Sequence, residues 1–181
     1  MRFTSLALAI ALPFTMPMAG FAAGGDTTTP PTPSDTTKKC WGKRVWDEDA
    51  QKCVKPEESS LSDEQLLQTA RELAYLERFE DAQAVLAAHP DQTDSRVLTY
   101  WGFTHRKLGH SSEAKDYYTH AIAQDPDNIL ARSYMAQGFV ETGEYAQALV
   151  QWKEIRARGG DGTWAEASLR QAIQTGVTVN Y

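Results

Sequence analysis

The feature of this sequence that most constrains its fold is an internal repeat with a period of 34 residues. One copy covers residues 95–128, and the next copy begins in register at Ile129. In the copy at 95–128, the small residues Gly102 and Ala114 allow two antiparallel helices to approach closely, and Pro126 stops the second helix before the next copy. The repeat therefore predicts helix pairs that stack on one another.

Two less regular copies and a terminal helix extend this pattern. The first copy starts near residue 63, and its second helix is short and ends at His89-Pro90. The third copy departs from the pattern at Arg132, where a large apolar residue is usual, and at Gly159-Gly160, which end the second helix without proline. Residues 164–175 form an amphipathic segment that we expect to cap the array.

The repeat resembles the tetratricopeptide family, and the copy at residues 95–128 carries the resemblance most clearly. The matching positions in that copy are Leu98, Trp101, Gly102, Ala114, Tyr118, Ala121 and Pro126. The resemblance covers roughly residues 60–175. It implies an all-α fold, a helical-hairpin solenoid of about three repeats with a capping helix. In this family the first helix of each pair contributes most of a concave groove that binds a partner.

The resemblance also implies which side chains line that groove. In the first two repeats, the partner-binding positions carried over from the family pattern include Arg71, Tyr75, Arg96, Phe103, Arg106 and Lys107. In the third repeat, the corresponding positions are Leu130, Ser133, Gln137, Val140 and Glu141. The groove is therefore expected to be basic and aromatic over its first two repeats, which favours an anionic or extended partner. The alternative is that these residues form an ordinary solvated helix face.

Residues 40–54 form a small unit bracketed by the chain's two cysteines, Cys40 and Cys53. In an exported chain these cysteines are expected to form a disulfide that closes a short hairpin. The unit resembles cysteine-bounded modules that precede repeat domains in some exported bacterial proteins and, more distantly, carbohydrate-binding cysteine hairpins. That resemblance implies glycan stacking on Trp41 and Trp46. The alternative is that the two rings pack the hairpin or dock on the helical domain.

The N-terminal region predicts export. Residues 1–22 have the layout of a secretory signal peptide, with Arg2 before a short apolar run at 6–14 and a cleavage point after Ala22. The apolar run is too short to span a membrane. Residues 23–39, rich in proline and threonine, are predicted to be a semi-extended linker. The mature protein is therefore expected in the periplasm or secreted, with no stable membrane span.

The composition and the motifs argue against nucleic-acid binding and catalysis. A net charge of -6 does not provide the basic footprint that phosphates require. The sequence has no phosphate-binding glycine loop, no nucleophile elbow and no histidine pair at helical metal spacing. We therefore expect a non-enzyme without a metal or a cofactor. The histidines, expected in core or surface roles, are His89, His105, His110 and His120.

Two function classes stay open at this point. The first is a protein–protein interaction scaffold or adaptor of the periplasm or cell envelope, which binds a protein or peptide partner in the concave groove. Self-association of the repeats is left open. The second is a glycan- or cell-wall-binding protein that uses the tryptophan-containing hairpin, with the repeats as a spacer.

Overall fold

The computed structural model describes residues 31–178, and the signal peptide predicted at 1–22 lies outside them. The described chain is mostly helical, with eight α-helices and one two-stranded hairpin. The elements in chain order are α1 (Asp35–Lys39), β1 (Val45–Asp47), β2 (Lys52–Val54), a 3-10 turn (Pro56–Glu58), α2 (Asp63–Tyr75), α3 (Phe79–Ala88), α4 (Ser95–Lys107), α5 (Ser111–Gln124), α6 (Ile129–Glu141), α7 (Tyr145–Ala157) and α8 (Trp164–Thr175). The predicted all-α solenoid behind a small disulfide hairpin is confirmed.

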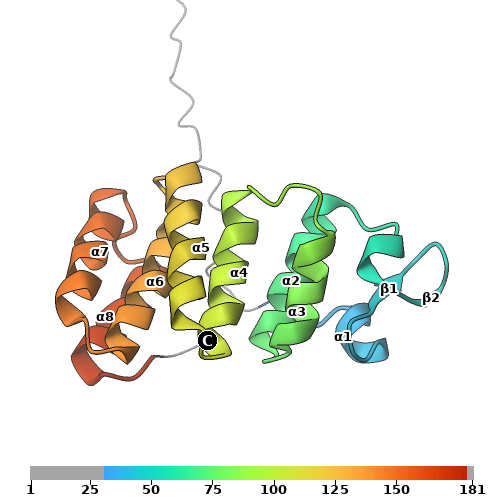
Figure 1. Ribbon diagram of the computed structural model, residues 1–181, viewed down its shortest axis with the longest axis horizontal. Helices are drawn as coiled ribbons and strands as arrows, with labels where there is room; N and C mark the ends of the chain where they lie inside the picture. The colour runs from blue at the N-terminus through green and yellow to red at the C-terminus, as the bar shows by residue number, and fades with distance from the viewer. Residues whose placement is uncertain (1–30, 179–181) are drawn as a thin grey trace, which may run out of the picture.

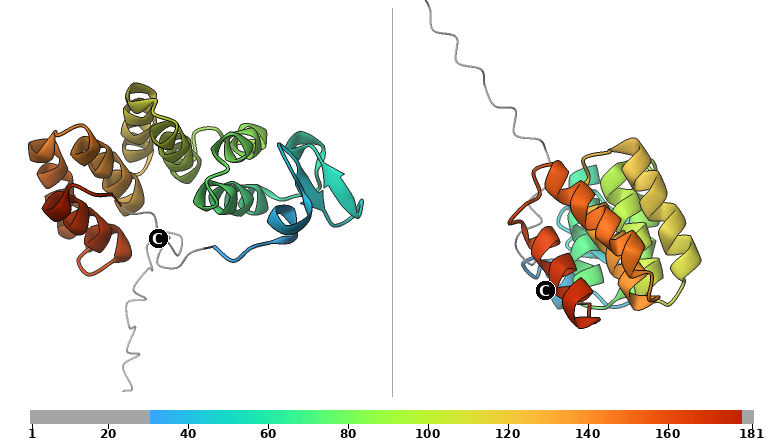
Figure 2. Two further views of the ribbon diagram at one scale, coloured as in Figure 1. Left: turned by 90° about the horizontal axis from the view of Figure 1, so that it is seen from below. Right: turned by 90° about the vertical axis from the view of Figure 1, so that its left-hand side faces the viewer.

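Helices α2 to α7 form three pairs, α2 with α3, α4 with α5, and α6 with α7 (Figure 1). The pairs follow an arc in the left-hand view of Figure 2, with the hairpin at one end and α7 and α8 at the other. Helix α2 contacts α4, α4 contacts α6, and α6 contacts α8. These four helices lie on the inner side of the arc, which we call the concave face.

Each helix of the concave face begins at a side chain that satisfies free backbone N–H groups. The capping residues are Ser62 for α2, Asp94 for α4, Asn128 for α6 and Thr163 for α8. At α2 the cap is reciprocal, because the side chain of Gln65 also accepts a hydrogen bond from the backbone N–H of Ser62. These caps set the residue at which the first helix of each pair begins, and so they set the spacing of the helix pairs along the sequence.

The close approach within the central pair involves Gly102 and the ring of Tyr118. A Cβ atom added at Gly102 would lie 2.6 Å from Cε1 of Tyr118. The sequence pattern pointed to Gly102 and Ala114 as the small residues that allow this approach, and Ala114 is indeed buried in the same core. The nearest atoms to Gly102 nevertheless belong to Tyr118, so the glycine makes room for a fully buried aromatic ring.

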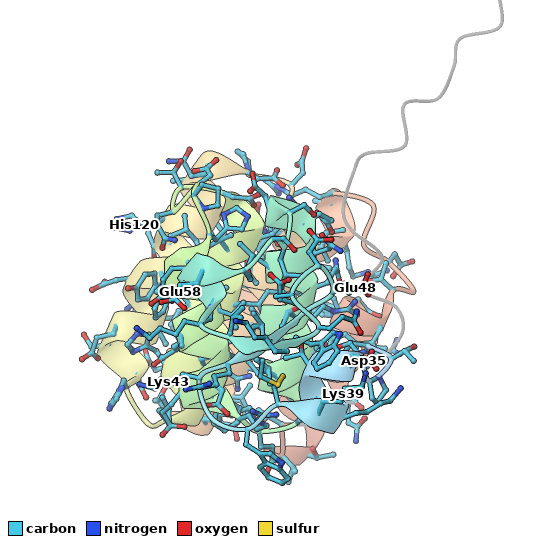
Figure 3. All side chains as sticks on the ribbon, turned by 90° about the vertical axis from the view of Figure 1, so that its right-hand side faces the viewer. Asp35, Lys39, Lys43, Glu48, Glu58 and His120 are labelled. Atoms are coloured by element: carbon cyan, nitrogen blue, oxygen red, sulfur yellow. A yellow bond between two sulfur atoms is a disulfide. The ribbon has the colours of Figure 1, made fainter. Side chains whose placement is uncertain are left out.

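The predicted hairpin and its disulfide are both present. Cys40 and Cys53 are bonded, with their Cα atoms 5.7 Å apart. Strand β1 pairs antiparallel with β2, so that Trp46 lies opposite Cys53. Figure 3 shows the disulfide at the hairpin end of the molecule.

The hairpin packs against the first helix pair. Val45 on β1 is fully buried and belongs to the same apolar core as the helices. The guanidinium group of Arg78, just before α3, donates to the backbone carbonyl oxygens of Cys40 and Gly42 at 3.4 and 3.2 Å. The hairpin therefore covers the end of the solenoid that α2 and α3 would otherwise expose.

The prediction of a semi-extended linker over residues 23–39 is wrong for its last residues, which form α1. The side chain of Ser34 caps this short helix. The backbone N–H of Ser34 donates to Oε1 of Glu72 at 2.6 Å, and the hydroxyl of Thr37 donates to the same oxygen. Because Glu72 is a buried residue of α2, a tertiary contact holds the segment that its composition alone would leave unstructured.

The disulfide gives a first prediction that intact mass spectrometry checks. The mass of the purified protein should increase by about two units when it is reduced, because one bridge becomes two thiols. Both cysteines should resist thiol labelling in the folded, unreduced protein. Full labelling without a reductant would contradict the bridge.

Candidate functional site

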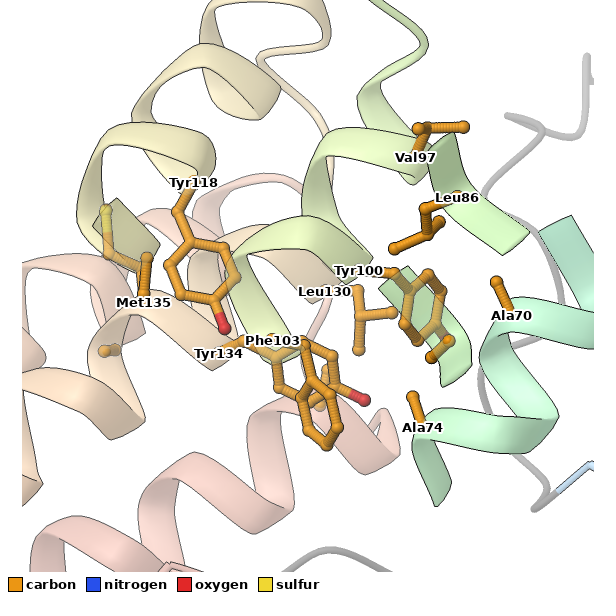
Figure 4. Packing of buried hydrophobic residues seen from close by; sticks show 14 of the residues in the cluster. Ala70, Ala74, Leu86, Val97, Tyr100, Phe103, Tyr118, Leu130, Tyr134 and Met135 are labelled. Carbon is orange, nitrogen blue, oxygen red and sulfur yellow. The ribbon is translucent and has the colours of Figure 1, made fainter. Parts of the chain in front are cut away.

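Aromatic side chains from four helices meet on the concave face. Phe103 of α4 lies at their centre, with its ring centroid 6.2 Å from that of Tyr75 and 4.8 Å from that of Tyr134. Figure 4 shows Phe103 and Tyr134 in contact between the helices. The hydroxyl oxygens of Tyr75 and Tyr134 are 2.9 Å apart, so a hydrogen bond joins the first repeat to the third. Trp164 of α8 packs edge-on against Tyr134 and extends the cluster.

Two of the predicted groove residues are buried in this arrangement. Phe103 is 1% exposed, because Tyr75, Tyr100 and Tyr134 surround its ring. The side chain of Arg106 is 2% exposed. The expectation that Phe103 and Arg106 face an open groove is therefore wrong.

Arg106 instead joins α4 to α6. Its Nη1 donates to Oε1 of Glu141 at 2.6 Å, and the hydroxyl of Thr178 donates to the same oxygen at 2.6 Å. A Cβ atom added at Gly138 would lie 3.2 Å from Cδ of Arg106, so the missing side chain leaves space for the arginine to cross α6. Arg106 is thus a buried structural cation whose charge is balanced at the edge of the concave face.

Three of the predicted residues are half-buried beside this aromatic cluster, and we call them the basic–aromatic surface: Arg71, Tyr75 and Lys107. The guanidinium of Arg71 lies 5.6 Å from the Tyr75 ring centroid, and Nζ of Lys107 lies 5.8 Å from that of Phe103. Burial lowers the pKa of Lys107 from its usual value, and the neighbouring charge of Arg106 lowers it further. A partly desolvated ammonium of this kind gains more from an anionic ligand than a fully hydrated one does.

The sixth predicted residue, Arg96, is exposed but already paired. It donates to Asp94 and to Glu64, each at 2.8 Å. The hydrogen bond that Arg96 donates to Asp94 raises the pKa of Arg96 above its usual value, and Glu64 adds to that effect. Its role in partner binding stays a prediction, although any partner would compete with two carboxylates for this guanidinium.

The third-repeat positions predicted for the groove are mostly covered by α8. The hydroxyl of Ser133 donates to the carbonyl oxygen of Ala165 at 2.7 Å, and the amide of Gln137 donates to the hydroxyl of Ser168 at 3.4 Å. Leu130, Val140 and these two polar residues are all buried. The capping helix therefore occupies the place that the first helix of a further repeat would take.

A cavity lies beside α2 at the hairpin end of the arc, and we call it the N-terminal cavity. Its volume is about 440 Å³, and its walls come from residues 31–36, from β1 with the adjoining turn, and from α2. Trp46 lines this cavity and is half-buried, with Nζ of Lys39 4.0 Å from its ring centroid. Trp41 is 87% exposed and does not line the cavity. The two tryptophans predicted to stack on a glycan are therefore in different environments.

Two of the four histidines, His105 and His110, pack with other rings. His105 stacks on Tyr117 at 5.2 Å and lies 5.5 Å from His110. Burial lowers the pKa of His105, and the nearby His110 lowers it further. Among the residues that the structure describes, no group of three or more histidine, cysteine, aspartate or glutamate side chains is placed to hold a metal ion.

The comparisons with known proteins agree with this geometry at the central pair. The sequence model of the tetratricopeptide repeat family matches residues 95–128, which contain α4, α5 and the turns that follow them. No curated protein and no solved structure matches the chain. The chain therefore contains a tetratricopeptide repeat at residues 95–128, inside a helical solenoid whose paired packing is typical of that repeat.

Proposed function

We propose that this protein is a non-catalytic interaction scaffold that holds an extended, anionic segment of a partner protein against its concave face. The observation that carries the proposal is the basic–aromatic surface, in which Arg71 lies against Tyr75 and Lys107 lies against the buried ring of Phe103. Tetratricopeptide arrays present such concave surfaces to peptides. Charge-assisted hydrogen bonds from Arg71 and Lys107 would fix a carboxylate, and Tyr75 would pack on the apolar part of the segment.

The disulfide supports an oxidising location for this scaffold. Bonds such as Cys40–Cys53 persist in the periplasm and outside the cell, and are rare in the reducing cytosol. We therefore place the scaffold in the periplasm, the cell envelope or the extracellular medium. In the part of the chain that the structure describes, no helix is long and apolar enough to cross a membrane.

Peptide binding tests the proposal through charge-removing variants. Peptides selected by the purified protein from a phage-displayed random library should be rich in Asp and Glu. Their Kd should rise about tenfold or more in the double variant Arg71→Gln and Lys107→Gln, because two sheltered charge-assisted contacts are lost. Added salt should weaken binding to the parent protein more than binding to the variant.

Lys153 provides the matched control. It is an exposed lysine on α7, and Lys153→Gln removes the same charge as Lys107→Gln. The Kd of this control should stay within about twofold of the parent value, since the lost charge is distant from the binding surface. If the control lost as much binding as the double variant, the loss would come from the change in net charge and not from contacts made by Arg71 and Lys107. Unchanged binding in the double variant would place the partner elsewhere.

A further inference from the structure

The N-terminal cavity has the dimensions of a ligand site. Its volume of about 440 Å³ falls within the range found for small-molecule sites. It is a composite site, because α1 and β1 contribute one wall and α2 contributes the other. Figure 3 shows Asp35 and Glu48, which both line the cavity, at the hairpin end of the molecule.

The chemistry of the walls excludes lipids and polyanions as ligands. Among the lining residues, the aliphatic side chains are Pro31 and Leu61, which offer little surface to a hydrocarbon chain. One arginine, Arg71, and four carboxylates line the cavity, so a phosphate, sulfate or uronate group inside it would meet an excess of negative charge. The carboxylates are those of Asp35, Glu48, Glu64 and Glu72.

A cationic ligand fits less well than a neutral one, because most of these carboxylates already have donors. Glu64 accepts hydrogen bonds from Arg96, Asp35 is paired with Lys39, and Glu72 accepts from the N-terminal segment. A cation would have to compete with those partners. A neutral hydroxyl group needs only one of the lone pairs that each carboxylate keeps available.

We propose that the N-terminal cavity binds a neutral oligosaccharide. The indole of Trp46, which lines the cavity and has Nζ of Lys39 4.0 Å from its ring centroid, offers an apolar surface to the C–H face of a sugar ring. The carboxylate of Glu48 offers acceptors to the hydroxyl groups. The side-chain amide of Gln68, exposed on α2, donates to Glu64 and accepts from Arg71, and it keeps one N–H and one lone pair for a further hydrogen bond.

The structure holds this tryptophan in place before any ligand arrives. The backbone N–H of Trp46 donates to the hydroxyl of Thr36 at 3.0 Å, and its strand neighbour Cys53 is fixed by the disulfide. A tryptophan whose backbone is already fixed loses less conformational freedom on binding. The disulfide hairpin thus acts as the support of the site.

This site differs from a tryptophan pair on an isolated hairpin with the repeats as a spacer. It uses Trp46 without Trp41, and it requires α2 of the first repeat. The proposal goes beyond partner binding by the scaffold and does not rest on it. Arg71 lines both surfaces, and the variants below leave Arg71, Tyr75 and Lys107 unchanged, so each proposal can fail without the other.

Calorimetric titration of the full mature protein with trisaccharides tests the site. Cellotriose and chitotriose are the neutral probes, and trigalacturonate is the anionic one. At least one neutral probe should bind, and trigalacturonate should not. Trp46→Ala should raise the Kd about tenfold, as the loss of one aromatic contact predicts. Gln68→Ala should raise it about threefold, since a neutral hydrogen bond is lost.

Trp41→Ala is the matched control, because it removes an equal ring outside the cavity. Its Kd should equal that of the parent. Circular dichroism reports whether Trp46→Ala keeps its fold, and Gln68→Ala carries the test if it does not, because Gln68 is exposed. The proposal is overturned if neither neutral probe binds at millimolar concentration, if trigalacturonate binds more tightly, or if Trp41→Ala alone abolishes binding.

Discussion

Replacing Gly102 with alanine is expected to lower the free energy of unfolding by about 2 kcal/mol, because the new Cβ overpacks the central helix pair. That atom would lie 2.6 and 2.7 Å from two carbons of the Tyr118 ring. The ring is fully buried, and α4 and α5 make the most extensive helix contact in the described chain, so neither side can move cheaply. Urea unfolding followed by circular dichroism measures the loss.

Gly138→Ala is the control for this experiment. Both glycines lie inside helices, so both substitutions gain the same helix propensity of about 1 kcal/mol. The neighbour at Gly138 is a methylene of Arg106 at 3.2 Å, on a flexible side chain that can shift slightly. Gly138→Ala should therefore be nearly neutral. Equal stability of the two variants would mean that α4 and α5 do not approach as closely as the structure shows.

Glu141→Ala should destabilise the protein by about 2 kcal/mol, because it leaves the buried cation of Arg106 without its carboxylate. The side chain of Arg106 is 2% exposed, whereas that of Glu141 is 36% exposed. Water can thus reach the vacated position, which keeps the cost below that of a fully buried pair. The measurement is again the free energy of unfolding in urea.

A double-mutant cycle isolates the ion pair from other effects of the substitution. With Arg106→Met in place, Glu141→Ala should cost less than about 0.5 kcal/mol, since no buried charge remains to be neutralised. Thr178→Val controls for the second hydrogen bond to Glu141. If Glu141→Ala costs the same in both backgrounds, the pair with Arg106 does not explain the loss.

The repeat period predicted the helices well, because helix starts and stops are local properties of the sequence. The first copy was expected near residue 63 and the third at Ile129, which are the starts of α2 and α6. The capping segment expected at 164–175 coincides with α8. N-caps and turn residues set such boundaries within a few residues of the chain, so a 34-residue phase was enough to place them.

The candidate site was harder to predict, because burial depends on how strongly the array curves. Phe103 occupies a position that faces the groove in the family pattern, but Tyr75 and Tyr134 close around it from neighbouring repeats. The same long-range dependence explains α1, whose stability rests on Glu72 of α2. Contacts between residues so distant in sequence leave no periodic signal in the chain. They cannot be inferred from the composition of either segment.

The hydrogen bond between Tyr75 and Tyr134 has a consequence for the mechanics of the array. In a repeat protein each unit ordinarily touches only its neighbours, so the ends fray and the whole behaves as an elastic strip. Here the first unit is linked to the third across the second. Flattening of the arc would break this hydrogen bond. Local unfolding of the first or the third unit would also remove it, and so would destabilise the other unit. The three units should accordingly resist bending and should unfold together as one cooperative unit.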